Sequence, residues 1–412
     1  MAPEADHGSD AVHAFLEAAN GISRPITNED DRNRVLLKLY ELVGKVESPW
    51  DTFVRVYITG PAVQSALKVL RDVRIFERWR KNGNSPLTAV ELAGLTDGFD
   101  PALLQRLLRV LVANNLVEMT SDGKYKPAGL CVKLAESDVN ITAKFYEDFH
   151  VPISQHLPTF LAKTGYKDPT HNDRSAFDST FGGHGGFFKY LTEHPESAEA
   201  FNVSQRTSTS MLARWTSIYP SDALVNEGDP QLPLLVDVGG SIGQDVQNFL
   251  ELHPRTASRV YLEDLPAVIA DENSTLVHGV NRVPYDFFTP QPIKHARAYY
   301  LHHIIHDWPD EQARKILEMQ KVAMKPGYSR LLLHDYILRD NGPDHPHAAV
   351  SDVLMMAFGG ASERTEQEWE NLLASAGLRI IKIWRVAFTG ECVIEAELQQ
   401  TPTSRSKPLS KM

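Results

Sequence analysis

The sequence predicts an α/β fold in which a mainly helical amino-terminal part precedes a mostly parallel sheet that ends in an antiparallel hairpin. From Gln231 onward the expected strands and helices alternate, which is typical of a parallel sheet with helices on both faces. An apolar strand at 234–238 runs directly into a glycine turn, as at the ligand-binding edge of such sheets. The last two expected strands are joined by a link at 387–390, which is short enough only for an antiparallel hairpin.

The composition allows two or three domains and narrows the kinds of partner. The chain has 412 residues, 42% of them hydrophobic, which is enough for substantial cores. Its formal net charge of −11 argues against nucleic acid as the main partner, because phosphate binding needs a basic surface. The two cysteines, Cys131 and Cys392, lie far apart in the sequence, so we expect no disulfide framework and a reducing compartment.

The two ends of the chain bear on localisation. Residues 1–10 are acidic and polar, without the apolar core of a signal peptide, and no apolar run is long enough to predict a membrane span. The terminal Ser410-Lys411-Met412 is close to the Ser-Lys-Leu peroxisomal signal, on a tail at 399–412 that we expect to be disordered. We predict a cytoplasmic protein, with peroxisomal import as the alternative.

The first 135 residues predict a mobile segment followed by a helical domain. Residues 1–30 are polar and expected to be mobile apart from a helical pattern at 11–19. A winged helix-turn-helix follows within 31–135. Its first short helix opens on the capping box Thr88-Ala-Val-Glu91.

The second helix of this module indicates whether the module binds DNA or another protein subunit. It begins at Asp100-Pro101, carries leucines at helical spacing, and is followed by a wing hairpin at 117–119 and 124–126. Arg106 and Arg109 raise DNA binding as an alternative. Because the helix is apolar on more than one side and no basic cluster flanks it, a partner subunit is favoured.

Residues 136–225 predict helices and loops that join this domain to the sheet and contribute to a substrate pocket. Aromatic residues are frequent here, and a glycine-rich stretch at 182–186 marks a flexible connection. We expect most of the aromatic side chains in the core and a few against a bound molecule. The sheet domain then spans 226–398, with expected strands at 234–238, 259–263, 275–279, 297–303, 330–336, 379–386 and 392–398.

The glycine turn predicts a cofactor site. Asp237 precedes Gly239, Gly240 and Gly243, and glycines let backbone approach a ligand closely. A dinucleotide site needs G-x-G-x-x-G, which this spacing does not match. S-adenosylmethionine also fits such a cradle, since an acid before the glycines suits its ammonium group. Asp264, at the end of the next strand, could hold a ribose; an ordinary strand-to-helix turn is the simpler alternative.

A histidine at a strand end predicts the chemistry. The strand at 297–303 runs into His306, where open α/β sheets bind their ligands. Asp335 ends the following strand, and Glu363 precedes a helix. A histidine beside acids is the arrangement of a general base held in one tautomer, whereas a single histidine more often has a structural role.

Taken together, these motifs resemble the S-adenosylmethionine-dependent O-methyltransferases of the caffeate and flavonoid type and their fungal secondary-metabolite relatives. The resemblance covers roughly residues 35–398. It implies a Rossmann-like, seven-stranded methyltransferase sheet preceded by a winged-helix dimerisation domain, and therefore a homodimer. The motifs that carry it are Asp237-x-Gly-Gly-x-x-Gly243, Asp264-Leu-Pro266, Tyr285-Asp-Phe-Phe288, His306-Asp-Trp-x-Asp-Glu311 and Glu363-Arg-Thr365.

The same resemblance implies roles for individual residues. His306 would be the general base, with Asp335 and Glu363 as flanking acids and no metal. Plant members carry glutamate where this chain has Asp335, and a lysine where it has His302; Ser241 replaces a third glycine found in many relatives. The residues implied to bind S-adenosylmethionine are Asp237, Gly239, Gly240, Asp264, Leu265, Asp286, Phe287 and His302.

The function predicted from the resemblance is methyl transfer to a hydroxyl of an aromatic, alkaloid or polyketide metabolite. Two alternatives remain. Some relatives bind S-adenosylmethionine but catalyse rearrangements or cyclisations without transferring the methyl group, usually with loss of the base. A winged-helix DNA-binding regulator is the other, which the acidic charge disfavours.

Overall fold

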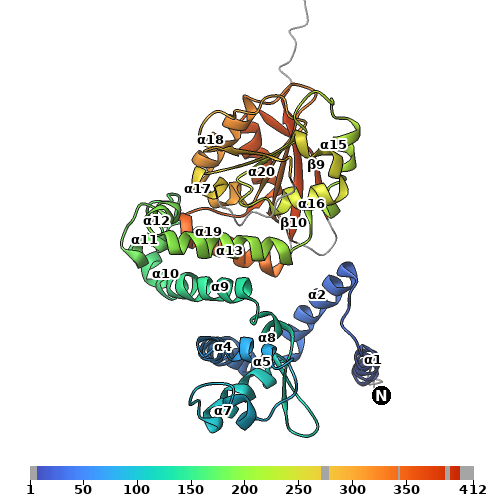
Figure 1. The fold of residues 1–412 in the computed structure, drawn as a ribbon, viewed down its shortest axis with the longest axis vertical. Helices are drawn as coiled ribbons and strands as arrows, with labels where there is room; N and C mark the ends of the chain where they lie inside the picture. Colours follow the sequence, from blue (N-terminus) through green and yellow to red (C-terminus); the bar gives the residue numbers. More distant parts are fainter. Residues whose placement is uncertain (1–6, 271–277, 342–343, 386–389, 400–412) are drawn as a thin grey trace, which may run out of the picture.

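The computed structural model describes residues 7–270, 278–341, 344–385 and 390–399. A helical amino-terminal body and a sheet body lie at opposite ends of the molecule, and helices between them connect the two (Figure 1). Of the tail expected at 399–412, Gln399 is described and hydrogen-bonds the Gly377 and Leu378 carbonyls, whereas residues 400–412 and the first six residues lie outside the described residues. Within the described ranges, no helix combines the length and apolar character needed to span a membrane.

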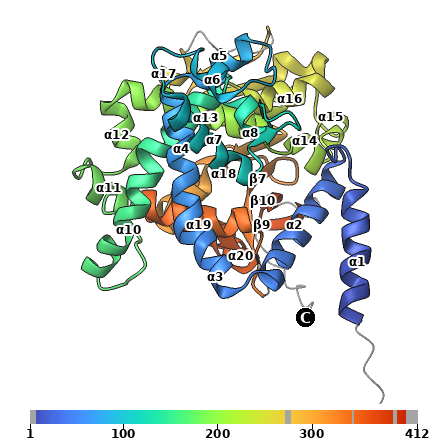
Figure 2. The ribbon, with the colours of Figure 1, turned by 90° about the horizontal axis from the view of Figure 1, so that it is seen from below.

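Short helices build the amino-terminal body. The helix expected at 11–19 is present and longer, and it projects from the rest of the body together with the helix that follows (Figures 1 and 2). The elements are α1 (His7–Asn20), α2 (Glu29–Val46), α3 (Pro49–Phe53), the π-helical turn η1 (Val54–Thr59), α4 (Gly60–Asp72), α5 (Ile75–Lys81), α6 (Ala89–Ala93), α7 (Pro101–Ala113) and α8 (Gly129–Lys133).

The expected winged helix is confirmed in its details. Thr88 and Glu91 form the capping box of α6, and the Asp100 carboxylate caps α7 ahead of Pro101. Strands β1 (Val117–Met119) and β2 (Tyr125–Pro127) pair antiparallel as the wing. The apolar face of α7 is buried in the core of this body, and Leu104, Leu108 and Leu111 are fully buried there. Burial of each leucine side chain contributes about 1.5–3 kcal/mol.

The connecting helices hold a core made largely of aromatic rings. Rings from α9, α10, α11, α12 and α13 and from the π-helical turn between α9 and α10 pack together, among them Phe149, Phe177 and Phe187. This agrees with the expectation that most aromatics in the region are core. The elements are α9 (Ser137–Phe145), the π-helical turn η2 (Tyr146–His150), α10 (Val151–Lys163), α11 (Ala176–Phe181), α12 (Phe187–Glu193), α13 (Pro195–Met211), α14 (Trp215–Ile218) and α15 (Asp222–Asn226).

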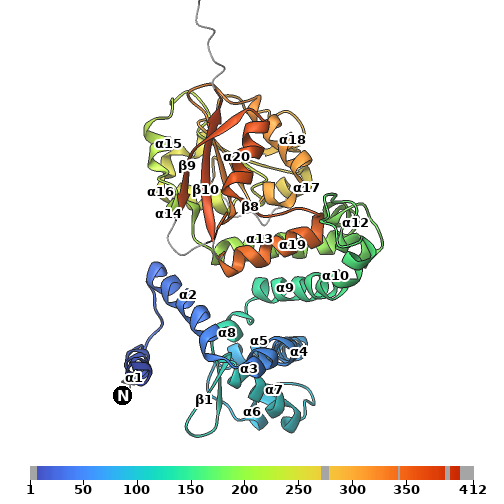
Figure 3. The same cartoon turned by 180° about the vertical axis from the view of Figure 1, so that it is seen from behind.

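The sheet runs in the order β5-β4-β3-β6-β7-β10-β9, and the two-residue strand β8 pairs with β7 off this path. The strands from β5 to β7 are parallel, whereas β10 pairs antiparallel with both β7 and β9, so the expected carboxyl-terminal hairpin is confirmed (Figure 3). The strands are β3 (Leu235–Val238), β4 (Val260–Asp264), β5 (Asn281–Pro284), β6 (Ala298–His302), β7 (Arg330–Leu338), β8 (Arg364–Thr365), β9 (Leu378–Arg385) and β10 (Glu391–Leu398).

One expected strand is placed wrongly by the sequence. The strand predicted at 275–279 corresponds to β5, which begins at Asn281, and residues 271–277 lie outside the described ranges. Gly279 has a φ of 97°, a left-handed conformation that a strand does not accommodate. Pro309 is the N-cap of the helix that starts at Asp310.

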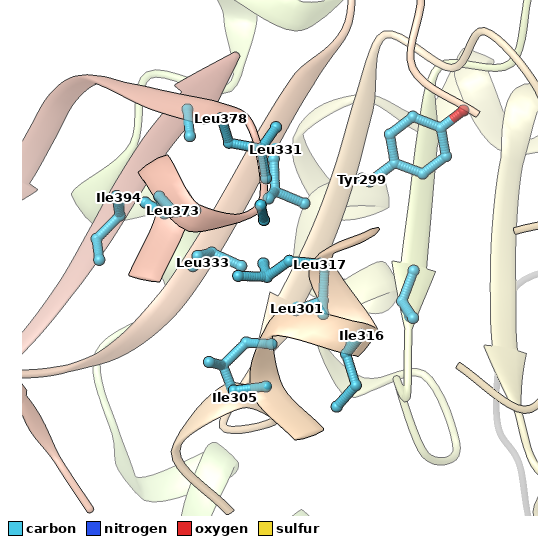
Figure 4. Close-up of a cluster of buried hydrophobic side chains, with 14 of the residues drawn as sticks. Tyr299, Leu301, Ile305, Ile316, Leu317, Leu331, Leu333, Leu373, Leu378 and Ile394 are labelled. Atoms are coloured by element: carbon cyan, nitrogen blue, oxygen red, sulfur yellow. The ribbon is translucent and has the colours of Figure 1, made fainter. Parts of the chain in front are cut away.

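Helices cover both faces of the sheet. One face is filled by leucine and isoleucine side chains from β6, β7 and β10 against two helices, a packing that includes Leu301, Leu317 and Leu333 (Figure 4). This rigid core holds the ends of the strands in place. The helices of this body are α16 (Gln244–Leu252), the 3₁₀ turns η3 (Pro254–Arg259) and η4 (Ile305–Asp307), α17 (Pro266–Ile269), α18 (Asp310–Lys321), α19 (Pro346–Gly359) and α20 (Glu366–Ser375).

Candidate active site at the carboxyl edge of the sheet

The strand ends gather the predicted residues at one edge. Strands β3, β4, β6 and β7 are mutually parallel neighbours, so their carboxyl ends meet at the same edge of the sheet. Asp264 and His302 are the last residues of β4 and β6, and the glycine turn leaves β3 between them. Helix α19 lies below this edge, between the sheet and the connecting helices (Figures 1 and 3).

The glycine turn leaves no room for side chains. A Cβ added to Gly240 would lie 2.4 Å from Asp237 Oδ2 and 2.6 Å from Leu262 Cδ1. Gly239 has a φ of 71°, and a Cβ there would lie 2.6 Å from Ile304 Cδ1 and 3.7 Å from the ring of Phe287. The turn therefore requires glycine at both positions.

Asp237 is a buried acid without a partner. Its side chain lies inside β3, and neither carboxylate oxygen has a hydrogen-bond partner among the described residues. Burial, and then the nearby Asp245, raise its pKa well above the usual value. Since an unpaired buried carboxyl is costly, the site favours a cationic or hydrogen-donating group beside Asp237.

Asp264 braces the same turn from the next strand. Its Oδ2 accepts a hydrogen bond of 2.8 Å from the Ser241 N–H, and its Oδ1 accepts one of 2.7 Å from the Leu265 N–H. Burial nevertheless raises its pKa. Ser241 has a φ of 52°, an uncommon conformation for a residue with a side chain. The carboxylate that the sequence assigned to a ribose thus also fixes the backbone of the cradle.

His302 faces the same space from β6. Its Nδ1 lies 2.7 Å from Asp245 Oδ2, and its buried Nε2 has no hydrogen-bond partner in the part of the chain that the structure describes. Burial lowers its pKa, but the charge and hydrogen bond of Asp245, together with the charges of Glu391 and Asp335, outweigh burial and raise the pKa. Asp245 opens α16 and was not among the predicted site residues.

The residues at this end of the edge fit S-adenosylmethionine. The molecule carries an ammonium group that an unpaired carboxylate suits, and the glycine cradle admits close approach of a ligand to the backbone. The structure brings Asp237, Gly239, Gly240, Asp264, Phe287 and His302 together around the turn, with Leu265 beside Asp264. The carboxylate of Asp286 instead accepts a hydrogen bond of 2.9 Å from the Phe288 N–H, within its own turn.

His306 lies at the other end of the edge, on the 3₁₀ turn η4 that follows β6. Its Nδ1 is 2.8 Å from Glu363 Oε1 and 3.8 Å from Asp335 Oδ1. Its Nε2 is 3.6 Å from Asp307 Oδ1. The three predicted residues are therefore brought together and buried. Glu363 is the hydrogen-bonding partner of the imidazole, and Asp335, at 3.8 Å, lies beyond hydrogen-bond distance.

The charges around His306 set its protonation. Burial alone would lower its pKa, but the charges of Glu363 and Asp307 outweigh burial and raise the pKa to about 10. Burial raises the pKa of Asp335 to about 7 and that of Asp307 to about 6. The pKa of Glu363 is lowered, because His306 outweighs its burial. At neutral pH the resting pair is an imidazolium and a carboxylate.

Side chains that the sequence analysis missed hold this pair in place. The Ser351 hydroxyl donates a hydrogen bond of 2.6 Å to Glu363 Oε1, and the Glu363 N–H donates one of 3.1 Å to Asp352 Oδ1. Both partners come from α19, which closely precedes Glu363 in the chain, and no local pattern marked them.

Arg364 fixes the turn that carries His306. Its guanidinium donates hydrogen bonds to the Ile305 carbonyl at 3.2 Å and to the Trp308 carbonyl at 2.8 Å, and it contacts the Asp310 carboxylate. Its position next to Glu363 in the motif Glu363-Arg-Thr365 could have identified Arg364 as a site residue from the sequence. A buried arginine bonded to two carbonyls of one turn holds the backbone on both sides of the base.

Further histidines line the edge but do not suit a metal ion. The ligand atoms of His302, His334 and Glu391 lie within 4.8 Å of one another. However, the rings of His302 and His334 stack at 3.9 Å with an interplanar angle of 19°. A metal ion lies in the plane of each imidazole that binds it, and two stacked rings cannot share such a point. We therefore assign no metal to this cluster.

Comparison with known proteins gives the same picture. Residues 165–379 match the model of an O-methyltransferase domain, and residues 56–137 match that of an O-methyltransferase dimerisation domain. The O-methyltransferase mfmE of Annulohypoxylon moriforme is 41% identical over 395 residues, which cover 96% of this chain and 98% of that protein.

Solved structures are similar over nearly the whole chain. The structure titled "A Pericyclic Reaction enzyme" has a TM-score of 0.84 and 28% identity and covers 95% of this chain and 100% of its own. The structure of OxaC in complex with SAH and oxaline has a TM-score of 0.79 and 25% identity and covers 95% and 98%.

Proposed function

The chain belongs to the S-adenosylmethionine-dependent O-methyltransferases, and from this membership we propose that His306 is the general base for methylation of a hydroxyl on an aromatic, alkaloid or polyketide secondary metabolite. The observation that carries the proposal is the 2.8 Å contact between His306 Nδ1 and Glu363 Oε1. With Nδ1–H donating to the carboxylate, the lone pair of the neutral imidazole is on Nε2. That nitrogen is then free to accept a proton from the acceptor hydroxyl.

The protein has two tasks in this reaction, alignment and proton removal. When bound, S-adenosylmethionine supplies a methyl group that its sulfonium charge already activates. The cradle around Gly239 and the turn fixed by Arg364 hold the two ends of the site at one rigid edge, and alignment supplies about 7–11 kcal/mol at best. His306 Nε2 takes the proton as the acceptor O–H bond breaks and the O–CH₃ bond forms. A positioned base adds about 10²–10⁴-fold to the rate.

The acceptor class follows from the surroundings of the base. Trp308, two residues after His306, stacks on Phe188 at 5.2 Å with an interplanar angle of 18°, and Phe358 lies in the aromatic cluster next to α19. Flat apolar acceptors suit such walls. A phenolic, enolic or N-hydroxyl oxygen is acidic enough for an imidazole base, and the proposal includes all three.

A non-methylating reaction on the same fold is the second candidate, because one similar solved structure is titled a pericyclic reaction enzyme. Such a reaction needs the cofactor's charge but no base. The presence of His306 with Glu363 hydrogen-bonded to it supports methyl transfer. A DNA-binding regulator is disfavoured by the net charge of −11, and a mobility-shift assay at physiological salt should show no shift.

The test is a product assay. Purified protein is incubated with S-adenosylmethionine and a panel of phenols, hydroxyquinolines and enolic polyketide models, and S-adenosylhomocysteine and acceptor products are measured by mass spectrometry. We expect equal amounts of S-adenosylhomocysteine and O-methylated product. An altered acceptor without S-adenosylhomocysteine would instead establish the non-methylating reaction.

We also propose that the protein is a homodimer assembled through its amino-terminal body. A large set of apolar side chains is exposed on α1 to η1, next to the matched dimerisation domain. Size-exclusion chromatography with light scattering should give twice the chain mass. The exposed residues are Val12, Phe15, Leu16, Ile22, Leu39, Tyr40, Val43, Val46, Trp50, Phe53, Val56, Tyr57 and Ile58.

Localisation to the cytoplasm remains a proposal, with peroxisomal import as the alternative. The tripeptide Ser410-Lys411-Met412 lies outside the described residues. A fluorescent protein fused to the amino terminus, with and without these three residues, should give the same diffuse distribution. Punctate fluorescence that requires the tripeptide would establish import.

A further inference from the structure

The π-helical turn η2 places a histidine that the mechanism above does not use. Between α9 and α10 the helix widens over Tyr146–His150, and Pro152 follows at the start of α10. Single π-helical turns occur frequently at functional sites, because the extra residue changes which side chains face a pocket. His150 is the last residue of this turn.

His150 is a neutral imidazole with unused hydrogen-bonding groups. Its ring lies 4.3 Å from that of Tyr146 and 4.9 Å from that of Phe358, and burial lowers its pKa to about 4. Neither ring nitrogen has a hydrogen-bond partner among the described residues. At neutral pH it therefore offers one donor and one acceptor to a bound molecule.

Two separate series of contacts link His150 to His306. The first passes through Phe358 of α19, the helix from which Ser351 holds Glu363. The next residue, Gly359, packs against η4, since a Cβ there would lie 3.3 Å from the Asp307 carbonyl oxygen. The η2 turn and the base thus face the same end of α19.

The second series passes over β7. Burial, then the charges of Glu391 and Glu363, and last that of Tyr146 raise the pKa of Tyr336, which lies on β7. The ring of Tyr336 stacks on His303 at 5.4 Å, and His303 stacks on His306 at 4.8 Å. His150 and His306 therefore lie on two sides of one region bounded by aromatic rings.

We propose that His150 is an acceptor-positioning residue, whose imidazole hydrogen-bonds a second oxygen of the acceptor, remote from the hydroxyl that His306 deprotonates. The inference rests on the methyl transfer proposed above. It narrows the acceptor to an uncharged aromatic compound with two separated oxygen functions, because a neutral imidazole among apolar rings suits a hydroxyl or carbonyl and offers no charge to a carboxylate.

The test compares acceptors that differ by one hydroxyl. Binding of naphthols and dihydroxynaphthalenes is measured by calorimetry in the presence of S-adenosylhomocysteine, so the result does not depend on turnover. We expect the wild type to bind the best diol about 3- to 10-fold more tightly than its mono-hydroxyl counterpart. His150→Phe should lose this preference, and His150→Asn, which keeps a donor and an acceptor, should retain part of it.

A second histidine of the connecting helices provides the matched control. His156, on α10, is bonded to Ser179 at 2.9 Å on the exposed side, so His156→Phe should leave the preference unchanged. For acceptors that turn over, His150→Phe should raise KM for the diol and leave both kcat and the pH profile within about twofold, since the proton transfer is made at His306.

Three results would overturn the inference. The wild type could show no binding preference for any diol over its mono-hydroxyl counterpart. His150→Phe could keep the preference. The preference could also fall equally in His150→Phe and His156→Phe. None of these bears on methyl transfer itself. That proposal fails separately, if no O-methylated product accompanies S-adenosylhomocysteine.

Discussion

The two ends of the catalytic edge differ in how their main acid, Asp237 or Glu363, is held in the protein alone. At the glycine turn, both oxygens of Asp237 and the Nε2 of His302 have no hydrogen-bond partner among the described residues. At the base, Glu363 Oε1 has two partners, His306 and Ser351, although Glu363 Oε2 and both oxygens of Asp335 have none among those residues. Both ends are buried to a similar degree, so exposure to water does not explain the difference.

The difference teaches which part of the site a ligand completes. An unpaired buried acid is stable only when something else supplies its partner, which is expected where a cationic cofactor binds. A base, in contrast, must have its orientation fixed before the acceptor arrives, and hydrogen bonds within the protein provide this. Five experiments test this contrast, in order of decreasing expected effect.

Removing the base should give the largest effect. In His306→Ala we expect kcat to fall by about 10²–10⁴-fold, while the affinity for S-adenosylmethionine, measured by calorimetry, stays within about twofold. His278→Ala, on a surface turn, is the control and should leave both unchanged. A His306→Ala variant with normal kcat would falsify the assignment of the base.

The pH profile should show the raised pKa of His306. The neutral imidazole is the active form, and its pKa is about 10, so kcat/KM measured at low substrate concentrations should rise about tenfold per pH unit from neutrality. Glu363→Gln removes the larger of the raising charges and should move the inflection to lower pH.

The stability of the folded protein should also depend on the ionisation of His306, but it should decrease as the pH rises. The folded-state pKa of His306 exceeds the unfolded value of about 6.5, so its contribution is fully present below that value and is lost as pH rises to about 10. We expect Tm to decrease over this window in the wild type and less so in Glu363→Gln. A flat profile of both rate and Tm would contradict the raised pKa.

At the glycine turn, Asp237→Asn should separate cofactor binding from stability. We expect the affinity for S-adenosylmethionine to fall by about 10- to 150-fold, as for loss of a hydrogen bond to a charged group. The Tm of the protein without cofactor should rise at neutral pH, because the unpaired buried carboxyl is removed. The control is Asp222→Asn, whose carboxylate is 86% exposed. A lower Tm in Asp237→Asn would show that the carboxyl has a partner in the free protein.

The smallest effect is expected for Ser351→Ala. Loss of its 2.6 Å hydrogen bond to Glu363 should lower kcat by about 2- to 10-fold and leave cofactor affinity unchanged. Ser351→Thr keeps the hydroxyl and should restore activity. If Ser351→Ala weakens cofactor binding as much as it lowers kcat, the two ends of the edge are not independent.

Local patterns predicted much of the fold and part of the site. The capping box at Thr88 and the wing hairpin appear as expected, because each depends on residues close in sequence. Only β5 was misplaced, where Gly279 interrupts the expected strand. At the site, His306 and Glu363 were predicted from the motifs that contain them, whereas Ser351 and Asp245 were not, because no motif around either residue marks the hydrogen bond that it makes in the folded protein.

The sequence by itself determined the α/β class, the glycine turn and the strand-end position of Asp264, since these follow from periodicity, backbone sterics and strand direction. The prediction that Asp335 ends its strand is wrong, because β7 continues to Leu338, and His306 lies on η4, beyond the end of β6. Only the tertiary structure decided that Glu363 rather than Asp335 holds the imidazole, that Asp237 has no hydrogen-bond partner among the described residues, and that the ring of His150 packs on that of Phe358. The physical reason is that hydrogen bonds and burial depend on distances of a few tenths of an ångström between elements that the chain brings together only on folding.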